Sequence, residues 1–270
     1  MQVAPMIVER QRWILERLTD RGSVRVVDLA RDLQVTTETI RRDLRQLDDA
    51  GRLQRTHGGA VPAEGAPERE PPLRLRQSIA LPEKIAVASA AADMVRPGEV
   101  IALDASSTAI ELAKRLPDDD LTVVSPSPVV CLLLAERKHT RVVCTGGTLD
   151  DDAVCFTGPI AEAVLAKLHI DRCFLSCRGV DPDRGLSEAT DRHGALKSRM
   201  LAVADQAVLM IDRGKLDVSG AFFFADLSDV DVVMVDRAAD SIPMQRLRER
   251  LRLRELELEL VTVTPPAAQP

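Results

Sequence analysis

An arginine-rich stretch near the amino terminus, TTETIRRDL at residues 36–44, has the composition and spacing for contact with nucleic acid. As a helix over about 37–49, it has one apolar stripe formed by Ile40, Leu44 and Leu47. The opposite face carries Glu38, Arg41, Arg42 and Arg45. One face can therefore pack in a core while the other grips phosphates and bases. For a lone run of arginines the alternative is a solvated surface helix.

A second group of polar residues follows the short apolar runs of the later sequence, where parallel strands would end. It comprises Asp104, Ser106, Ser107, Thr108, Ser125, Gly146, Gly147, Arg178, Asp212 and Lys215. Lys197, in a helix expected after 185–187, adds a second lysine to this group. Hydroxyls and free N–H groups at a helix amino terminus bind anions, and phosphate is the natural occupant. These residues favour a phosphorylated polar ligand. The alternative is that Ser107 and Thr108 only cap a helix.

Catalytic and metal chemistry have weaker support. His193 has no cluster of carboxylates or histidines beside it in the sequence, so we expect a surface or pocket-rim histidine. The five cysteines lack paired CxxC spacing and are interpreted as buried free thiols: Cys131, Cys144, Cys155, Cys173 and Cys177. A metal or redox role for Cys173 with Cys177 is the alternative. We predict no catalytic residue, no metal site and no cofactor.

The elements around the arginines predict a winged helix-turn-helix domain over residues 1–61. Helical spacing over about 9–20 and 27–33, then a tight turn into 37–49, gives the DNA-binding arrangement. Residues 52–61 alternate like a hairpin strand and would form the wing. The expected DNA-binding residues are Thr36, Thr37, Glu38, Thr39, Arg41, Arg42, Arg45, Arg52, Arg55 and His57. These elements in this order favour DNA binding over a merely solvated helix.

The charge distribution agrees with two parts of different role. Residues 1–61 contain 11 Arg against 9 Asp and Glu, whereas the remainder holds 25 basic and 33 acidic residues. The whole chain has a formal net charge of -6. A slightly basic domain on an acidic one fits a small DNA-binding unit attached to a larger sensing unit.

Residues 62–82 are rich in Pro, Glu and Arg and predict a linker. From 83 to 264, apolar runs alternate with helical patterns, which predicts an α/β domain with a mainly parallel sheet. The expected strands are 100–103, 121–124, 141–144, 173–176, 208–211, 232–235 and one ending at 263. The expected helices are 84–94, 109–116, 129–136, 160–168 and 194–204. One continuous carboxy-terminal helix used for dimerisation is the alternative to the last strand; residues 265–270 are expected to be a disordered tail.

The sequence carries no signal-like start and no apolar run of membrane-spanning length. We therefore expect a cytoplasmic protein with no membrane partner.

The run TTETIRRDL, followed by LQRTHGGAV, resembles the DeoR-type family of bacterial sugar-metabolism repressors. The resemblance covers residues 9–61 closely. It implies that Thr36, Thr37, Thr39, Arg41 and Arg42 approach base edges and phosphates. It also implies that Asp43 orients a neighbouring arginine rather than touching DNA.

Residues 84–235 resemble the sensor domain of that family, which is similar in fold to ribose-5-phosphate isomerase. The resemblance implies a phosphate loop at 106–109, a ligand-facing turn at Gly146 and Gly147, and basic pocket residues Lys197 and Lys215. This chain departs from the family at Pro126, Ser106, 192–195 and Gly214, where the family usually has Asn, Gly, a Glu-rich segment and Ser. These departures bear on which effector is sensed.

Together these patterns predict a sequence-specific transcriptional regulator, a repressor of a carbohydrate-metabolism operon released by a phosphorylated sugar or related metabolite. Its partners would be double-stranded operator DNA, this effector, and further copies of itself as a homodimer or homotetramer. A sugar-phosphate isomerase-like enzyme with a DNA-binding domain is one alternative, with Asp104 as base and Lys197 as electrophile. A DNA-architectural protein without sequence preference is another.

Overall fold

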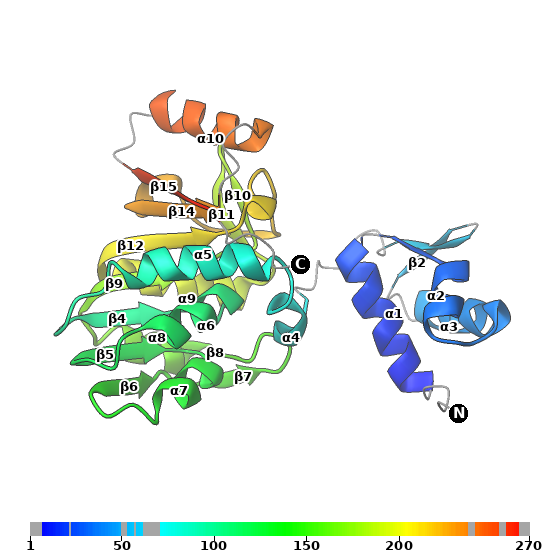
Figure 1. Cartoon of the computed structure of the whole chain (residues 1–270), viewed down its shortest axis with the longest axis horizontal. Helices are drawn as coiled ribbons and strands as arrows, with labels where there is room; N and C mark the ends of the chain where they lie inside the picture. Colours follow the sequence, from blue (N-terminus) through cyan, green and yellow to red (C-terminus); the bar gives the residue numbers. More distant parts are fainter. Residues whose placement is uncertain are drawn as a thin grey trace. The chain divides into compact units, whose positions relative to one another are not determined.

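The computed structural model describes residues 7–21, 23–49, 53–56, 58–61, 71–236, 241–253 and 258–264. They belong to two compact units, which we call the head (Met1–Pro71) and the body (Pro72–Pro270) (Figure 1).

The head is a three-helix unit with a small antiparallel sheet. Its elements are α1 (Ile7–Arg21), β1 (Val24–Arg25), α2 (Val26–Asp32), α3 (Thr37–Asp49), β2 (Gln54–Thr56) and β3 (Gly59–Val61). The sheet order is β1-β3-β2. Ile14 of α1 packs with Ile40 and Leu44 of α3 in one buried cluster. The predicted winged helix-turn-helix, including the apolar stripe of α3, is confirmed.

A glycine allows the wing to lie against the first strand. A Cβ atom at Gly59 would stand 1.7 Å from the carbonyl oxygen of Val24, well inside van der Waals contact. Only glycine therefore permits the pairing of Arg25 with Gly59 that joins β1 to β3.

A buried ion pair joins α1 to α3. The Asp43 side chain is fully buried, and its two oxygens accept hydrogen bonds from Nε and Nη2 of Arg10. The hydrogen bond to Asp43 raises the pKa of Arg10. Asp43 points into the head, which agrees with the expectation that it orients an arginine.

The body has one parallel sheet with helices on both faces and smaller sheets beside it (Figure 1). Its elements are α4 (Leu73–Arg76), α5 (Leu81–Ala92), β4 (Val100–Leu103), α6 (Ser107–Arg115), β5 (Leu121–Ser125), α7 (Pro128–Leu134), β6 (Thr140–Cys144), β7 (Thr148–Asp150), β8 (Cys155–Thr157), α8 (Pro159–Leu165), β9 (Ile170–Leu175), β10 (Gly179–Asp181), β11 (Gly185–Glu188), α9 (Asp191–Ala202), β12 (Ala204–Ile211), the 3-10 turn η1 (Arg213–Lys215), β13 (Phe222–Ala225), the 3-10 turn η2 (Leu227–Asp229), β14 (Val232–Asp236), α10 (Ile242–Leu253) and β15 (Glu259–Val263).

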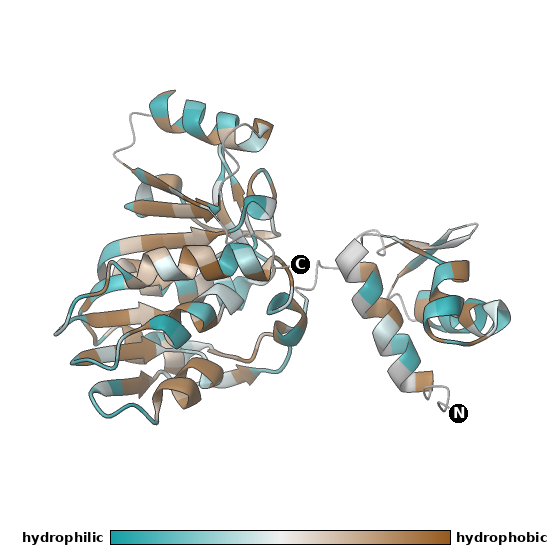
Figure 2. Cartoon of the chain, in the orientation of Figure 1, coloured by the Kyte–Doolittle hydropathy of each residue, from teal (hydrophilic) through white to brown (hydrophobic). Residues whose placement is uncertain are grey.

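The seven strands of the large sheet run parallel in the order β15-β14-β12-β9-β4-β5-β6. Its strands are predominantly hydrophobic, as expected for a sheet covered on both faces (Figure 2). Ile101 and Leu103 pack with α5, α6 and α7, whereas Ala102 packs with α8, α9 and α10 on the other face. Because all strands are parallel, their carboxyl ends meet at one edge, where the second polar group was expected.

The structure differs from the predicted linker in its second half. Residues from Pro72 belong to the body, and α4 and the start of α5 lie within the predicted 62–82 linker. Leu73 is buried in the core, and its N–H donates to the carbonyl of Asp152 at 2.9 Å. Leu73 is the buried residue of α4, and apolar residues scattered among charged ones give little sequence signal of such docking.

The alternative of one long carboxy-terminal helix is wrong. α10 ends at Leu253, and β15 pairs in parallel with β14 from Glu259 to Val263. The last strand, which was predicted from apolar residues at every second position, is thus confirmed. The tail at 265–270 lies outside the described residues.

Breaking the Arg10–Asp43 pair should destabilise the head. Asp43→Ala removes the carboxylate that binds the largely buried Arg10 guanidinium, so we expect a loss of roughly 3 kcal/mol in the free energy of unfolding. Trp13 packs against the head core and is the only tryptophan of the chain, so its fluorescence during urea denaturation reports on the head alone. Glu38→Gln, which breaks an exposed pair with Arg41, is the control and should cost under about 1 kcal/mol. Equal midpoints for the two variants would contradict the assignment.

Candidate DNA-binding and effector sites

The predicted recognition helix α3 presents its arginines to solvent. Arg41, Arg42 and Arg45 are all exposed. Thr36 caps the helix, because its Oγ1 accepts a hydrogen bond from the N–H of Thr39 at 3.1 Å. The carboxylate of Glu38 lies 3.4 Å from Nη1 of Arg41. At this distance in solvent the contact is weak, so Arg41 can exchange it for a phosphate or base.

The wing stands next to α3. The N–H of Arg55 in β2 donates to Asp48 of α3 at 3.3 Å, and the Arg55 side chain is exposed. Thr37 and Thr39 are partly exposed on the first turn of α3. Arg52 and His57 lie outside the described residues.

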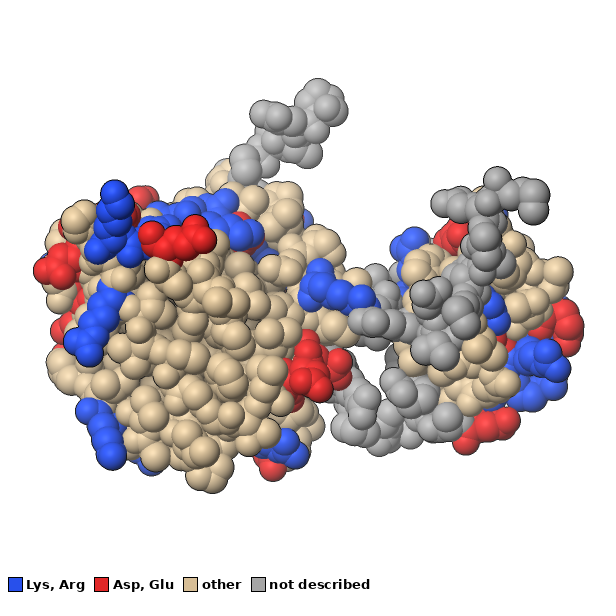
Figure 3. All heavy atoms as spheres, turned by 90° about the horizontal axis from the view of Figure 1, so that it is seen from below, with Lys and Arg blue, Asp and Glu red and all other residues tan. Residues whose placement is uncertain are grey.

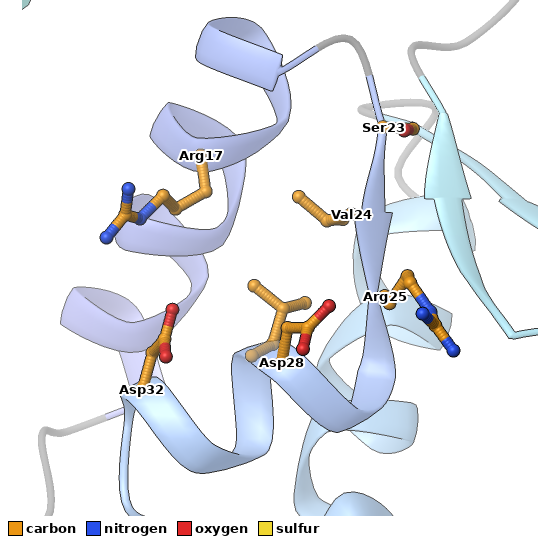
Figure 4. A pocket seen from close by; sticks show the side chains of 7 residues that line it. Arg17, Ser23, Val24, Arg25, Asp28 and Asp32 are labelled. Atoms are coloured by element: carbon orange, nitrogen blue, oxygen red, sulfur yellow. The ribbon is translucent and has the colours of Figure 1, made fainter.

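A cavity of about 230 Å³ lies in the head but contains none of the predicted DNA-binding residues. It is lined by Arg17, Ser23, Val24, Arg25, Asp28, Leu29 and Asp32, which come from α1, β1 and α2 (Figure 4). Asp28 and Asp32 both form ion pairs with Arg31. The lining holds two arginines and two aspartates, so its formal charges balance and it shows no preference for an anion such as phosphate.

In the body, Lys197 of α9 joins three segments at the carboxyl edge of the sheet. Its Nζ lies 3.0 Å from Asp104 Oδ2 and 2.5 Å from Glu188 Oε1, and it donates to the carbonyl of Ser176 at 2.7 Å. Both carboxylates are buried. These three contacts match the three donors of an ammonium group, so Lys197 holds the site together rather than facing a ligand freely.

Asp104 is held ionised inside the protein. Burial by itself raises its pKa, but Lys197 and hydrogen bonds from Ser106 and Ser176 outweigh burial and lower the pKa below the ordinary value. The N–H of Ser106 donates to Oδ1 at 3.0 Å, and that of Ser176 donates to Oδ2 at 2.9 Å. A carboxylate with a lowered pKa is a poor general base near neutral pH, which argues against the predicted alternative of an isomerase.

Lys215 has a different environment. Its Nζ donates to Ser176 Oγ at 2.7 Å, and among the described residues no carboxylate lies within ion-pair distance of it. Its positive charge is therefore not neutralised by a neighbour. Ser176 connects it to Asp104, so the two lysines belong to one site.

The amino terminus of α6 completes this group. Ser106 is the cap, with its Oγ accepting from the N–H of Ala109 at 3.0 Å. Thr108 is 1% exposed, and its hydroxyl has no hydrogen-bond partner within the described chain. Capping by Ser106 leaves the Ser107 and Thr108 N–H groups of the first turn without intrahelical acceptors. The alternative in which Ser107 and Thr108 are the cap is thus wrong.

Other predicted effector residues have local structural roles. The Ser125 hydroxyl donates to the carbonyl of Leu103 and accepts from the N–H of Ser127, which ties β5 to β4. Asp212 caps the 3-10 turn that carries Lys215. A Cβ atom on Gly147 would stand 2.6 Å from the carbonyl of Thr157, so Gly147 allows the turn after β6 to approach β8.

The remaining two residues predicted for the effector site are Gly146 and Arg178. Gly146 has a φ of 63° and lies in the same turn as Gly147. Arg178 follows β9, and its backbone N–H donates to the carbonyl of Ser187 at 2.9 Å.

Sequence reasoning missed Glu188 and Ser176. The Glu-rich segment of the family is replaced in this chain at 192–195, which suggested that Lys197 had lost its acidic neighbours. The structure supplies Glu188 from β11 instead. The one signal in the sequence was the run GLSE at 185–188, whose composition suggests a buried strand. No spacing in the sequence connects this run with Lys197.

His193 and the cysteines differ in part from expectation. His193 is only 6% exposed, so it is not a surface histidine. Cys155, Cys173 and Cys177 are buried, and burial raises the pKa of Cys155 and of Cys177 to about 12. Cys144 is exposed, contrary to expectation. Elsewhere, His169 lies 3.2 Å from Asp205 at the opposite edge of the sheet, near Asp171, in a largely exposed group.

Comparison with known proteins matches each of the two units with a known domain. The DeoR-like helix-turn-helix domain matches residues 10–65, and the DeoR C-terminal sensor domain matches residues 80–237. The HTH-type transcriptional regulator YulB of Bacillus subtilis, itself uncharacterized, is 38% identical over 91% of this chain and 95% of that protein.

The chain belongs to the DeoR family.

Further relatives of this DeoR-family protein are named for operons. The L-fucose operon activator of Haemophilus influenzae is 33% identical over 85% of this chain and 92% of its own length. The putative aga operon transcriptional repressor of Escherichia coli O157:H7 is 32% identical over 89% of this chain and 90% of its own length. The DeoR-family protein is thus a DNA-binding transcriptional regulator with an effector-sensing domain, and not an enzyme.

Among solved structures, ribose 5-phosphate isomerase A of Methanocaldococcus jannaschii is 18% identical, with a TM-score of 0.36. The likeness covers 49% of this chain and 52% of that one, and nothing about function follows from it. Within the described residues, no helix is both long and apolar enough to cross a membrane.

Removing Lys197 should destabilise the body in a pH-dependent way. Lys197→Met leaves Asp104 and Glu188 buried without their cation, so we expect a loss of about 3 to 5 kcal/mol at pH 7, measured by urea denaturation with far-ultraviolet circular dichroism. In the wild type, the lowered pKa of Asp104 stabilises the fold above its unfolded pKa, and this contribution disappears as pH falls through the folded pKa.

In Lys197→Met, burial is no longer opposed by the ammonium, so Asp104 should take up a proton in the folded state. The stability difference from wild type should therefore shrink as pH falls from 7 towards about 4. Lys215→Met is the control and should cost about 1 kcal/mol, because it removes one hydrogen bond. A difference independent of pH would refute the buried-charge explanation.

Proposed function

We propose that this DeoR-family regulator represses a carbohydrate-metabolism operon in the cytoplasm and leaves its operator when a phosphorylated sugar or related metabolite binds the body. Relatives named for the L-fucose and aga operons support carbohydrate metabolism as the regulated process. One of these relatives is named an activator and the other a repressor. Repression by this chain, rather than activation, is therefore part of the proposal. The observation that carries the effector class is the site shared by Lys215 and the amino terminus of α6.

That site suits a phosphate monoester. Lys215 offers a charge with no carboxylate partner in the described chain, and Thr108 offers a buried hydroxyl with no hydrogen-bond partner there. The first turn of α6 adds N–H groups and the positive end of the helix dipole. An anion bound there would satisfy all three groups at once. Lys197 is already engaged by Asp104 and Glu188, so the cation left for an anionic ligand is Lys215.

Operator recognition is assigned to α3 and the wing. Arg41 and Arg42 are exposed on the face opposite the apolar stripe, where an arginine can reach two acceptors of a guanine in the major groove. We assign phosphate contacts, which set affinity and salt dependence, to the exposed Arg45 and Arg55.

Two heads are needed for a symmetric operator, so we propose a homodimer or homotetramer joined through the body. Leu132 and Leu133 of α7 are exposed, Leu132 by 74%. The face of the body seen from below, where α7 lies, has few charged side chains (Figure 3). A broad uncharged face with exposed leucines supports self-association through it. Effector binding would then favour a body arrangement in which the paired heads no longer match the operator.

Removing the two groove-facing arginines should abolish operator binding. A bidentate arginine–guanine contact contributes about 1 to 3 kcal/mol, so the Arg41→Ala/Arg42→Ala double variant should lose specific binding altogether. The probe is the duplex that the wild type selects from a random-sequence library, tested by gel shift. Arg31→Ala, on α2, is the matched control because Arg31 is engaged with Asp28 and Asp32. Full affinity in a folded double variant would disprove the role of α3.

Effector binding should depend on Lys215 and Thr108. In a thermal-shift screen of sugar phosphates with inorganic phosphate as reference, at least one compound should raise the melting temperature of the wild type. Lys215→Ala and Thr108→Val should lose this shift. Lys114 lies on the same helix as Thr108 but pairs with Glu111, so the control variant Lys114→Ala should keep the shift. If every compound leaves the wild type unchanged, the proposed effector class is wrong.

A further inference from the structure

Two cysteines from different elements lie together at one edge of the large sheet. Cys144 is the last residue of β6, which is the outermost strand of this sheet and pairs with β5 (Figure 1). Cys131 lies in α7, the helix that connects β5 to β6. Neither cysteine has a role in the DNA-binding or effector sites.

Both cysteines lie beside the backbone of Ser125. The thiol of Cys131 donates to the carbonyl oxygen of Ser125, with 3.6 Å between sulfur and oxygen. The same oxygen accepts a hydrogen bond from the N–H of Thr145 at 3.2 Å, and Ser125 is the register partner of Cys144. Because Cys144 directly precedes Thr145, its backbone lies next to the carbonyl group that the Cys131 thiol contacts.

The Cys144 side chain is on the face of the sheet that α7 covers. Val142 packs in the cluster that contains Val130 and Leu134 of α7. Side chains two residues apart in a strand point to the same face, so Cys144 points towards α7 as Val142 does. The environment of the other thiol agrees with this, because burial, the charge of Cys144 and a hydrogen bond to it raise the pKa of Cys131 to about 12.

The two thiols differ in their access to solvent. Cys144 is exposed and Cys131 is partly buried. The remaining cysteines are buried in the core of the body: Cys155, Cys173 and Cys177. An oxidant in solution therefore reaches Cys144 first, and Cys131 is the neighbouring thiol that can react with the oxidised sulfur.

We propose that Cys131 and Cys144 form a redox-active thiol pair, which a hydroperoxide converts into a disulfide within the chain. The Cys144 sulfur attacks one oxygen of the hydroperoxide, the O–O bond breaks, and the thiol proton passes to the departing oxygen. Cys144 is then a sulfenic acid, and an alcohol, or water from hydrogen peroxide, has left. The Cys131 sulfur attacks the sulfenic sulfur, the S–S bond forms, and the hydroxyl group leaves with the Cys131 proton as water. The two thiols thus supply the two electrons that reduce the hydroperoxide.

The disulfide would join α7 to the end of β6, directly before the turn that contains Gly146 and Gly147. Small thiols can attack a disulfide that has one exposed sulfur, so the bond should be reversible. Transient disulfides of this kind are the ones that occur in reducing compartments. The reaction needs neither DNA nor effector, and it is independent of the proposed function.

The test is oxidation of the folded full-length chain by hydrogen peroxide over a range of protein concentrations, followed by alkylation, trypsin digestion and mass spectrometry. Trypsin cleaves after Arg137 and Arg141, so the peptides that carry Cys131 and Cys144 separate unless a disulfide joins them. The wild type should give the joined peptides at every protein concentration, and a reductant should separate them. Cys131→Ser should instead accumulate a sulfenic acid at Cys144, which dimedone traps.

The peptide that carries Cys144 also carries Cys155, so Cys155→Ala is the matched control. This variant should give the joined peptides like the wild type, whereas Cys144→Ser should not. If Cys155→Ala does not fold by circular dichroism, fragmentation of the joined wild-type peptides assigns the bond to Cys144 or to Cys155 directly. Joined peptides in Cys144→Ser, a bond assigned to Cys155, a disulfide between two chains in place of the internal one, or thiols that stay reduced each overturn the proposal.

Discussion

The body depends on how one buried carboxylate is compensated. Asp104 directly follows β4, an inner strand of the large sheet, and is 1% exposed, so its charge is tolerable only with partners. Lys197 provides the cation, and the backbone of Ser106 and Ser176 provides two donors. Since Lys197 also binds Glu188, one ammonium fixes α9 and β11 against the end of β4. The amino terminus of α6 and the 3-10 turn carrying Lys215 are positioned by the same contacts.

The head uses a similar device for a different purpose. Asp43 lies on the recognition helix but points inward to Arg10, so it holds α3 on α1 while the arginines of α3 face solvent. In each unit, a buried ion pair sets the orientation of the helix next to the functional surface, and the groups left for a ligand are those without such partners. Arg10 and Lys197 are held by buried carboxylates, whereas Arg41 and Lys215 have no buried carboxylate partner among the described residues.

Much of the architecture followed from periodicity. Strands such as 100–103 and 232–235 are short apolar runs bounded by polar residues, and buried strands of a parallel sheet have that composition. The strands β7, β8, β10, β11 and β13 were not predicted; the first four are short and contain polar residues or glycine, so none of them forms an apolar run. The docking of α4 was missed because it depends mainly on Leu73.

The sequence by itself determined the elements, the order of the two units and the recognition helix, because these depend on residues within a few positions of one another. It also placed Asp104, Lys197 and Lys215 at strand ends or beside them. Only the tertiary structure decided that Lys197 is neutralised by Glu188 and Asp104 while Lys215 is not, and that His193 faces Asp150 in the interior. Those contacts join segments far apart in the chain, and they exist only because the order and register of the parallel strands bring these segments to one edge.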